Sequence, residues 1–135
     1  MSTNFERFSE EALLAMLGWG EARGEGALGI LAVQWVAKNR ADKRNRALKD
    51  VILQPWQFSC FNPGPGQEKL VAAAHLEPES WGMSLGSAGL LLGGHTLDPT
   101  AGATHFYSVT IQPPRWTKGW IELTQIGRHI FGIAR

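Results

Sequence analysis

Apolar residues recur at intervals of three and four positions over the first forty residues of the chain. Leu13, Leu14 and Leu17 share one helical face, and the same spacing returns over 27–40 after a glycine-rich break. Such spacing is typical of helices that bury one side in a core. The sequence therefore predicts two buried helices, over 10–23 and 27–40.

The rest of the chain carries weaker signals of the same kind. Pro and Gly separate the segments, and β-branched and aromatic residues gather near the C-terminal quarter. We expect a helix over 47–53, an aromatic loop over 56–66, helices over 67–76 and 79–92, and a strand over 104–111. The chain has 135 residues, the usual length of one domain. The expected fold is helix-dominated α+β, a single domain over 1–135 with a small strand region in its C-terminal part.

The charges are nearly balanced, with a net charge of +1 and a pI near 8.0. Such a balance gives no broad electrostatic footprint, so we do not expect nucleic acid as a partner. A basic run over 38–49 is the exception, because its Lys and Arg residues are accompanied by Asp42 alone. The run is either a solvated face after the second helix or a surface that attracts an acidic partner.

Cysteine and histidine are used sparingly. Cys60 is the only cysteine, and the four His residues lack the short spacings of metal-binding motifs. We therefore expect no disulfide, no metal and no cofactor. No segment reaches the roughly 20 apolar residues of a membrane span, and 1–7 lack the features of an export signal. We expect synthesis without Sec export.

Two glutamates near the first helix differ in their expected environments. Glu21 lies four residues after Leu17, so it continues the core-facing side near the C-terminal end of that helix. The helix dipole and partial burial there should raise its pKa, as suits a general acid. Glu25 lies at the start of the second helix, where free N–H groups should lower its pKa. On spacing alone, an ion pair of Glu21 with Arg23 or a more distant arginine is the alternative.

Five blocks of sequence follow one another from about position 13 to 131. The first block is 20–25, together with Gly29, Ala32–Val33 and Asn39–Arg40. The other four are 54–60, 98–107, Trp116 and 126–131. In this order they resemble the cell wall hydrolase family that includes spore-cortex-lytic enzymes. Five ordered blocks are far more specific than any one motif.

The resemblance implies a lysozyme-like fold and an enzyme that cleaves peptidoglycan glycan strands between N-acetylmuramic acid and N-acetylglucosamine. It implies that Glu21 is the catalytic residue. It also implies a sugar-binding cleft, to which we assign Glu25, Gln57, Phe58, Thr104, His105 and Tyr107. Aromatic faces can pack on sugar rings, and the polar side chains can bond hydroxyl and N-acetyl groups. For Phe58 and Tyr107 a purely structural place in the core is the alternative.

The number of carboxylates bears on the mechanism. A two-carboxylate glycosidase needs a second acid about 5 to 9.5 Å from the first. Asp50 and Asp98 are the acids near the matching blocks, and Asp98 precedes Pro99 in a turn, where Asp commonly bonds its own backbone. We therefore predict a lytic transglycosylase that uses Glu21 alone, with a hydrolytic muramidase as the alternative.

Two other functions are compatible with the residues. Cys60 with His105 or His129 could form the nucleophilic pair of an amidohydrolase, although no basic residue near Cys60 in the sequence lowers its pKa. A non-catalytic glycan-binding module would use the aromatic residues and leave Glu21 incidental.

The resemblance and the expected absence of an export signal together suggest a phage endolysin. We expect a monomer that acts on peptidoglycan and accumulates in the host cytoplasm until the inner membrane is breached.

Overall fold

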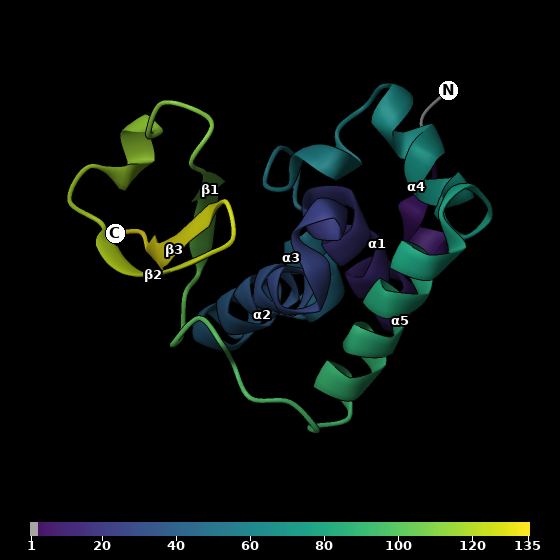
Figure 1. The fold of residues 1–135 in the computed structure, drawn as a ribbon, viewed down its shortest axis with the longest axis horizontal. Helices are drawn as coiled ribbons and strands as arrows, with labels where there is room; N and C mark the ends of the chain where they lie inside the picture. Colours follow the sequence, from purple (N-terminus) through teal and green to yellow (C-terminus); the bar gives the residue numbers. More distant parts are fainter. Residues whose placement is uncertain (1–2) are drawn as a thin grey trace.

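The structure, a computed structural model, describes residues 3–135 and places a helical body beside a small sheet (Figure 1). The helices are α1 (Glu10–Ala22), α2 (Gly26–Arg44), α3 (Leu48–Leu53), α4 (Pro65–Leu76) and α5 (Pro78–Leu92). The strands are β1 (His105–Ser108), β2 (Ile121–Ile126) and β3 (His129–Ile133). Short 3₁₀ turns are η1 (Phe5–Arg7), η2 (Arg23–Glu25), η3 (Ser59–Phe61) and η4 (Arg115–Thr117). This confirms the expected helix-dominated α+β domain. No helix among residues 3–135 is both long and apolar enough to cross a bilayer.

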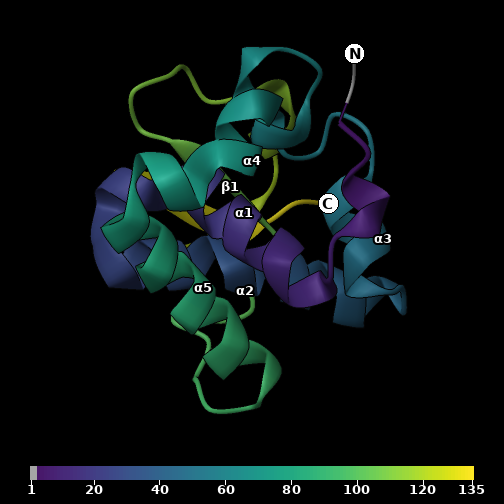
Figure 2. The same cartoon turned by 90° about the vertical axis from the view of Figure 1, so that its right-hand side faces the viewer.

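Helix α1 lies at the centre of the helical body and contacts α2, α3, α4 and α5 (Figure 2). Its N-terminus is capped by Ser9, whose Oγ accepts a hydrogen bond of 3.1 Å from the Ala12 N–H. Leu13, Leu14 and Leu17 are fully buried, as their spacing predicts. The core of the protein is therefore built around the helix that ends at the candidate site.

Two glycines let other segments approach α1 closely. A Cβ at Gly18 would lie 2.6 Å from Ser84 Oγ, and one at Gly20 would lie 2.6 Å from the Cys60 Cβ. Both distances are shorter than real side chains tolerate. Helix α1 continues through both glycines to Ala22, within one residue of the end expected from the sequence.

Helix α2 is longer than expected. Its apolar spacing ends near Arg40, but the helix continues to Arg44 and stops where Asn45 adopts a left-handed conformation with φ 52°. The extra turn is solvated and includes an i,i+4 ion pair between Lys38 and Asp42, 2.6 Å apart. Apolar periodicity does not predict this last turn of α2, because the turn is stabilised by contacts between charged side chains.

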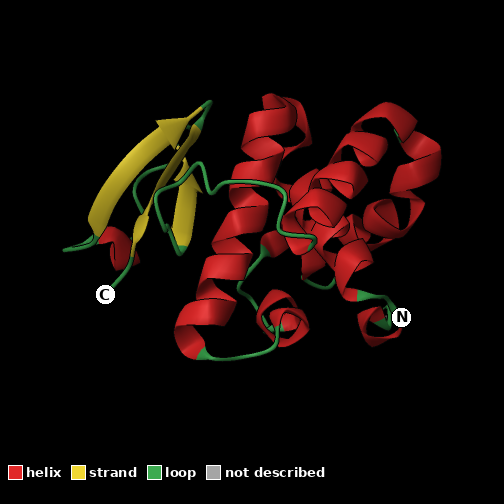
Figure 3. Cartoon of the chain, turned by 90° about the horizontal axis from the view of Figure 1, so that it is seen from below, coloured by secondary structure: helices red, strands yellow, loops and turns green. Residues whose placement is uncertain are grey.

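The sheet has the order β1-β3-β2, with both pairings antiparallel. It forms a separate layer beside α2 (Figure 3). The strand expected over 104–111 is shorter, covering only His105–Ser108, and β2 and β3 were not predicted. Phe131 on β3 is fully buried and joins the sheet to the helical core.

Candidate active site

A cleft of about 500 Å³ separates the helical body from the sheet. We call its first side the helical wall, formed by the end of α1 and the loop 56–61, and its second side the sheet wall, formed by β1 and the segment 109–120. The lining residues are Glu21, Arg40, Trp56, Gln57, Phe58, Ser59, His105, Phe106, Tyr107, Ile111, Pro114 and Trp116. The cleft thus combines one carboxyl group with polar and aromatic side chains, a set suited to a carbohydrate.

Glu21 lies next to the last residue of α1 and is half-buried at the cleft. Burial raises the pKa of its carboxyl group above the ordinary value, and nearby donors from Ser59 and Cys60 oppose that rise only in part. Ser59 Oγ lies 3.5 Å from both carboxyl oxygens. The direction of the pKa shift agrees with the sequence-based expectation, and burial is its largest cause. A carboxyl group of this kind can keep its proton long enough to donate it.

Cys60 contacts the same end of α1 but is poorly suited to nucleophilic attack. Burial, and then the negative charge of Glu21, raise the pKa of the Cys60 thiol well above its ordinary value. The thiolate is the nucleophilic form, so a thiol held protonated is inert. The amidohydrolase alternative therefore loses its nucleophile.

Arg40 connects the two walls, a role the sequence analysis missed. Its Nη1 donates to Gln57 Oε1 at 3.3 Å, and its Nε donates to the Thr104 carbonyl oxygen. The guanidinium carbon also lies 4.8 Å from the centre of the Phe58 ring. Phe58 is 2% exposed, so it is a core residue that forms the floor of the cleft.

Aromatic side chains build the sheet wall. The ring centres of His105 and Trp116 are 5.2 Å apart, those of Tyr107 and Trp116 are 6.3 Å apart, and Trp116 meets Trp120 at 5.4 Å. His105 and Tyr107 line the cleft as expected. Trp116 lines it too, although the sequence pointed to it only as part of the family resemblance. The wall offers ring faces against which sugars can pack.

Thr104 lies outside the cleft lining and is 4% exposed. Its hydroxyl lies 2.9 Å from His105 Nδ1, so Thr104 orients the imidazole instead of facing the cleft. Burial, followed by the charges of Arg40, Arg44 and Lys43, lowers the pKa of His105 to about 4. The imidazole is therefore neutral near pH 7 and can accept or donate a hydrogen bond.

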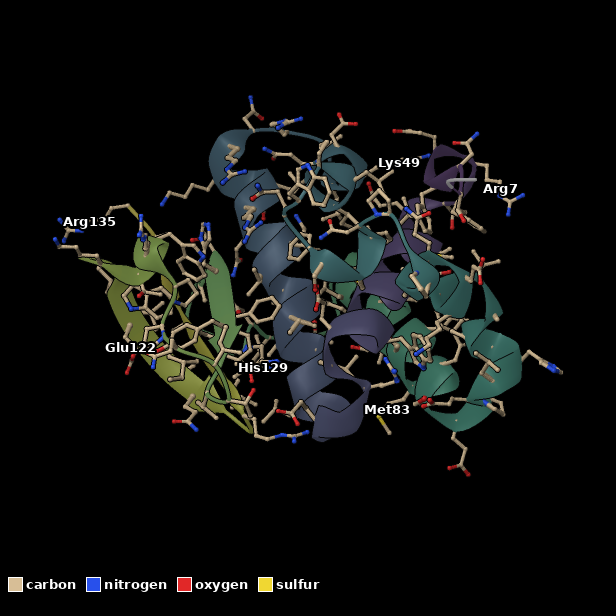
Figure 4. All side chains as sticks on the ribbon, turned by 90° about the horizontal axis from the view of Figure 1, so that it is seen from above. Arg7, Lys49, Met83, Glu122, His129 and Arg135 are labelled. Atoms are coloured by element: carbon tan, nitrogen blue, oxygen red, sulfur yellow. The ribbon has the colours of Figure 1, made fainter. Side chains whose placement is uncertain are left out.

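Glu25 also lies outside the cleft lining, in an adjacent pocket of about 240 Å³ that includes Glu21 and His129. Its carboxylate accepts hydrogen bonds from the Arg128 backbone N–H at 2.7 Å and from the Arg128 guanidinium at 3.0 and 3.1 Å. These donors lower the pKa of Glu25, as expected from the sequence. The expected cause, the free N–H groups at the start of α2, is wrong. The donors come from the β2–β3 turn, and the Glu25 side chain does not cap α2. Figure 4 shows His129 on the side of the sheet that faces the helices.

No second acid joins Glu21 among the described residues that line the cleft. Asp50 is exposed on α3. Asp98 accepts hydrogen bonds of 2.8 Å from the backbone N–H groups of Thr100 and Gly102, so it stabilises its own turn.

Comparisons with known proteins identify related sequences and folds. Residues 24–132 match the family described as Cell Wall Hydrolase, a match that begins just after Glu21. Over 125 residues the chain is 29% identical to the spore cortex-lytic enzyme of Halalkalibacterium halodurans. The aligned region covers 88% of this chain and 33% of that enzyme. The chain thus spans about a third of the length of this curated relative.

Two solved structures have a similar fold. The catalytic domain of the germination-specific lytic transglycosylase SleB from Bacillus anthracis has a TM-score of 0.69 and 22% identity, covering 96% of this chain and 99% of that domain. The catalytic domain of the Bacillus cereus SleB protein has a TM-score of 0.61 and 25% identity, covering 91% and 88%.

Proposed function

The chain belongs to the cell wall hydrolase family, and from this premise we propose that it cleaves peptidoglycan glycan strands between N-acetylmuramic acid and N-acetylglucosamine. The observation that carries the proposal is the position of Glu21, whose burial raises its pKa at a cleft faced by aromatic rings. A carboxyl group there can protonate the oxygen that leaves when the glycosidic bond breaks. The name of the Bacillus anthracis relative, a lytic transglycosylase, supports the same class of chemistry.

We propose a lytic transglycosylase mechanism, since the lining of the cleft offers Glu21 as its one acid among the described residues. Glu21 gives its proton to the leaving oxygen as the bond to C1 of muramic acid breaks. Glu21, now a carboxylate, then accepts the proton of the C6 hydroxyl while that oxygen bonds C1. The product is a 1,6-anhydro ring, and the acid is restored without water.

A Glu21→Gln variant tests the role of the acid. The amide keeps the shape of the side chain but cannot donate the proton, so lysis of purified cell walls should fall to background. Glu25→Gln is the matched control, because it makes the same change outside the cleft lining and should reduce lysis less. Circular dichroism should show both variants folded. Lysis that survives in Glu21→Gln, or equal losses in the two variants, would contradict the assignment.

Mass spectrometry of the digest tests the mechanism. A hydrolysed muramic acid end is heavier by one water than an anhydro end, so the two products separate cleanly. We expect anhydro ends to dominate. Reducible muramic acid ends as the main product would replace the transglycosylase with a hydrolytic muramidase and leave Glu21 as the acid.

We also propose the biological setting, a phage endolysin that accumulates in the host cytoplasm. The same cleavage of peptidoglycan could serve host lysis as well as germination, the role in the name of one relative. Expression in a Gram-negative host should be tolerated until the inner membrane is permeabilised. Lysis on expression alone would contradict a cytoplasmic store.

A further inference from the structure

Arg40 is a buried cation without a carboxylate partner. It is 4% exposed, and its hydrogen-bond acceptors are the Thr104 carbonyl and the Gln57 amide oxygen, both neutral. No Asp or Glu oxygen among residues 3–135 lies within ion-pair distance of it. Burying an unpaired charge is costly, so an anionic ligand that reaches Arg40 would offset part of that cost.

A second pocket, of about 430 Å³, is also lined by Arg40. It shares Arg40, His105 and Trp116 with the cleft, so it extends the cleft toward the C-terminal end of α2. Its remaining lining residues are Lys43, Arg44, Thr104, Ala134 and Arg135. We call it the basic pocket, because four of its eight described lining residues are Arg or Lys and none has an acidic side chain.

The charges of the basic pocket converge on one place. Arg40, Arg44 and Lys43 all help burial to lower the pKa of His105, which lies at the junction with the cleft. Arg44 has one long hydrogen bond, 3.4 Å to Gln54 Oε1, and forms no ion pair with a described residue. Arg40, Lys43 and Arg44 therefore concentrate positive charge at the pocket without an ion-pair partner among the described side chains.

The basic run over 38–49 divides into two parts in the structure. Lys38 is paired with Asp42, and Lys49 Nζ lies 4.0 Å from a carboxylate oxygen of Glu6. Arg46 is exposed and lines neither the cleft nor the basic pocket. Lys43 and Arg44 are the members that line the pocket with Arg40. A merely solvated face does not explain why these side chains surround a cavity that continues the cleft.

We infer that the basic pocket is a carboxylate subsite, which binds the peptide substituent of a muramic acid residue while the glycan strand occupies the cleft. This inference rests on the proposed function. The peptides on muramic acid end in carboxylates, and guanidinium groups bind carboxylates through paired hydrogen bonds. The enzyme would then favour peptide-bearing strands over bare glycan.

A double variant, Lys43→Gln with Arg44→Gln, tests the subsite. The substrates are purified glycan strands with their peptides and the same strands after an amidase has removed them, both free of phosphate polymers. We expect the ratio of kcat/KM on the two substrates to fall about tenfold in the double variant, mainly through KM. Arg46→Gln, from the same run but outside the pocket, should keep the wild-type ratio. An unchanged ratio in the double variant, or an equal fall in Arg46→Gln, would overturn the subsite.

Binding to the inactive Glu21→Gln protein separates this inference from the proposed function. When Lys43→Gln and Arg44→Gln are introduced into the Glu21→Gln protein, the Kd for peptide-bearing strands should rise about tenfold. The protein should then bind the two substrates with nearly equal affinity. Equal affinity of the Glu21→Gln protein for both substrates would refute the subsite. If the wild-type protein cleaves neither substrate, the proposed function fails, while the binding result still decides the subsite.

Discussion

The two walls of the cleft are held in place by different interactions. The helical wall is an extension of the core, since α1 is buried from Leu13 to Trp19 and Gly20 lets the loop 56–61 lie against it. The sheet is a separate layer, joined to the core by the buried Phe131 and the half-buried Phe106, and by two polar contacts, from Arg40 to the Thr104 carbonyl and from Arg128 to Glu25. The acid thus lies on a wall that belongs to the core, and the aromatic rings lie on a layer that a few apolar and polar contacts attach to it.

The walls also differ in protonation. Burial raises the pKa of Glu21 on the helical wall, while burial and neighbouring cations lower the pKa of His105 on the sheet wall. Both shifts favour an uncharged group inside the cleft. A cleft that keeps its own groups neutral leaves the positive charge of Arg40 as its dominant field.

The largest expected effect comes from breaking the helical wall at its base. Leu17→Ala removes a fully buried side chain of α1 and should lower the free energy of unfolding by about 2–5 kcal/mol. Leu97→Ala is the control, since Leu97 is 90% exposed and its loss should cost less than about 0.5 kcal/mol. Denaturant unfolding measures both. Similar losses in the two variants would mean that α1 is not the base of the core.

A smaller effect is expected from loosening the sheet wall. Glu25→Gln weakens the charge-assisted bonds to the exposed Arg128 side chain and should lower the free energy of unfolding by about 0.5–1 kcal/mol. Amide exchange should accelerate over 121–133 and remain slow in α1, because the defect is local. Glu122→Gln makes the same change at an exposed position of β2 and should be neutral (Figure 4). Uniform acceleration across both regions would show that the walls unfold as one unit.

The contrast in protonation predicts a pH-dependent gain in Glu21→Gln. Because the folded state raises the pKa of Glu21, it binds the proton more tightly than the unfolded chain does, and stability falls as pH rises from the ordinary value of 4.5 through the raised value. Glu21→Gln removes that loss, so its melting temperature should exceed that of the wild type at neutral pH. The difference should vanish below pH 4.5. A gain independent of pH would rule out buried charge as its cause.

His105 should show the opposite dependence with the smallest effect. Its pKa is lowered from 6.5 to about 4, so the unfolded state binds the proton more tightly, and stability falls as pH drops through this range. In NMR titrations the His105 imidazole signals should stay constant through pH 6.5 and move only near pH 4. Titration near pH 6.5 would show that His105 is solvated and that the sheet wall is open.

Local patterns predicted the helical body well. The helix over 67–76 and that over 79–92 begin within two residues of α4 and α5, because turn residues and apolar spacing act over a few positions. Strands β2 and β3 were missed. A bulge between Glu122 and Thr124 breaks the alternation of β2, and β3 is central, so its apolar residues do not alternate cleanly with polar ones.

The sequence predicted several of the residues that gather at the cleft, but not the contacts that hold them there. Glu21, Gln57, His105 and Tyr107 line one cleft as expected. The partner of Glu25 lies 103 residues away in the chain, and no local pattern relates two such positions. The role of Arg40 was missed for the same reason, since its acceptors lie on a loop and a strand that meet only in the folded chain.

The sheet order β1-β3-β2 places the last strand to be synthesised between the other two. While the protein is being translated, β1 and β2 leave the ribosome without a neighbour to pair with, and they stay unpaired until His129–Ile133 follows. Helices, whose contacts are local, can form much earlier. We therefore expect a nascent chain to carry its acid long before it has an aromatic surface to hold a sugar, which keeps incomplete chains inactive.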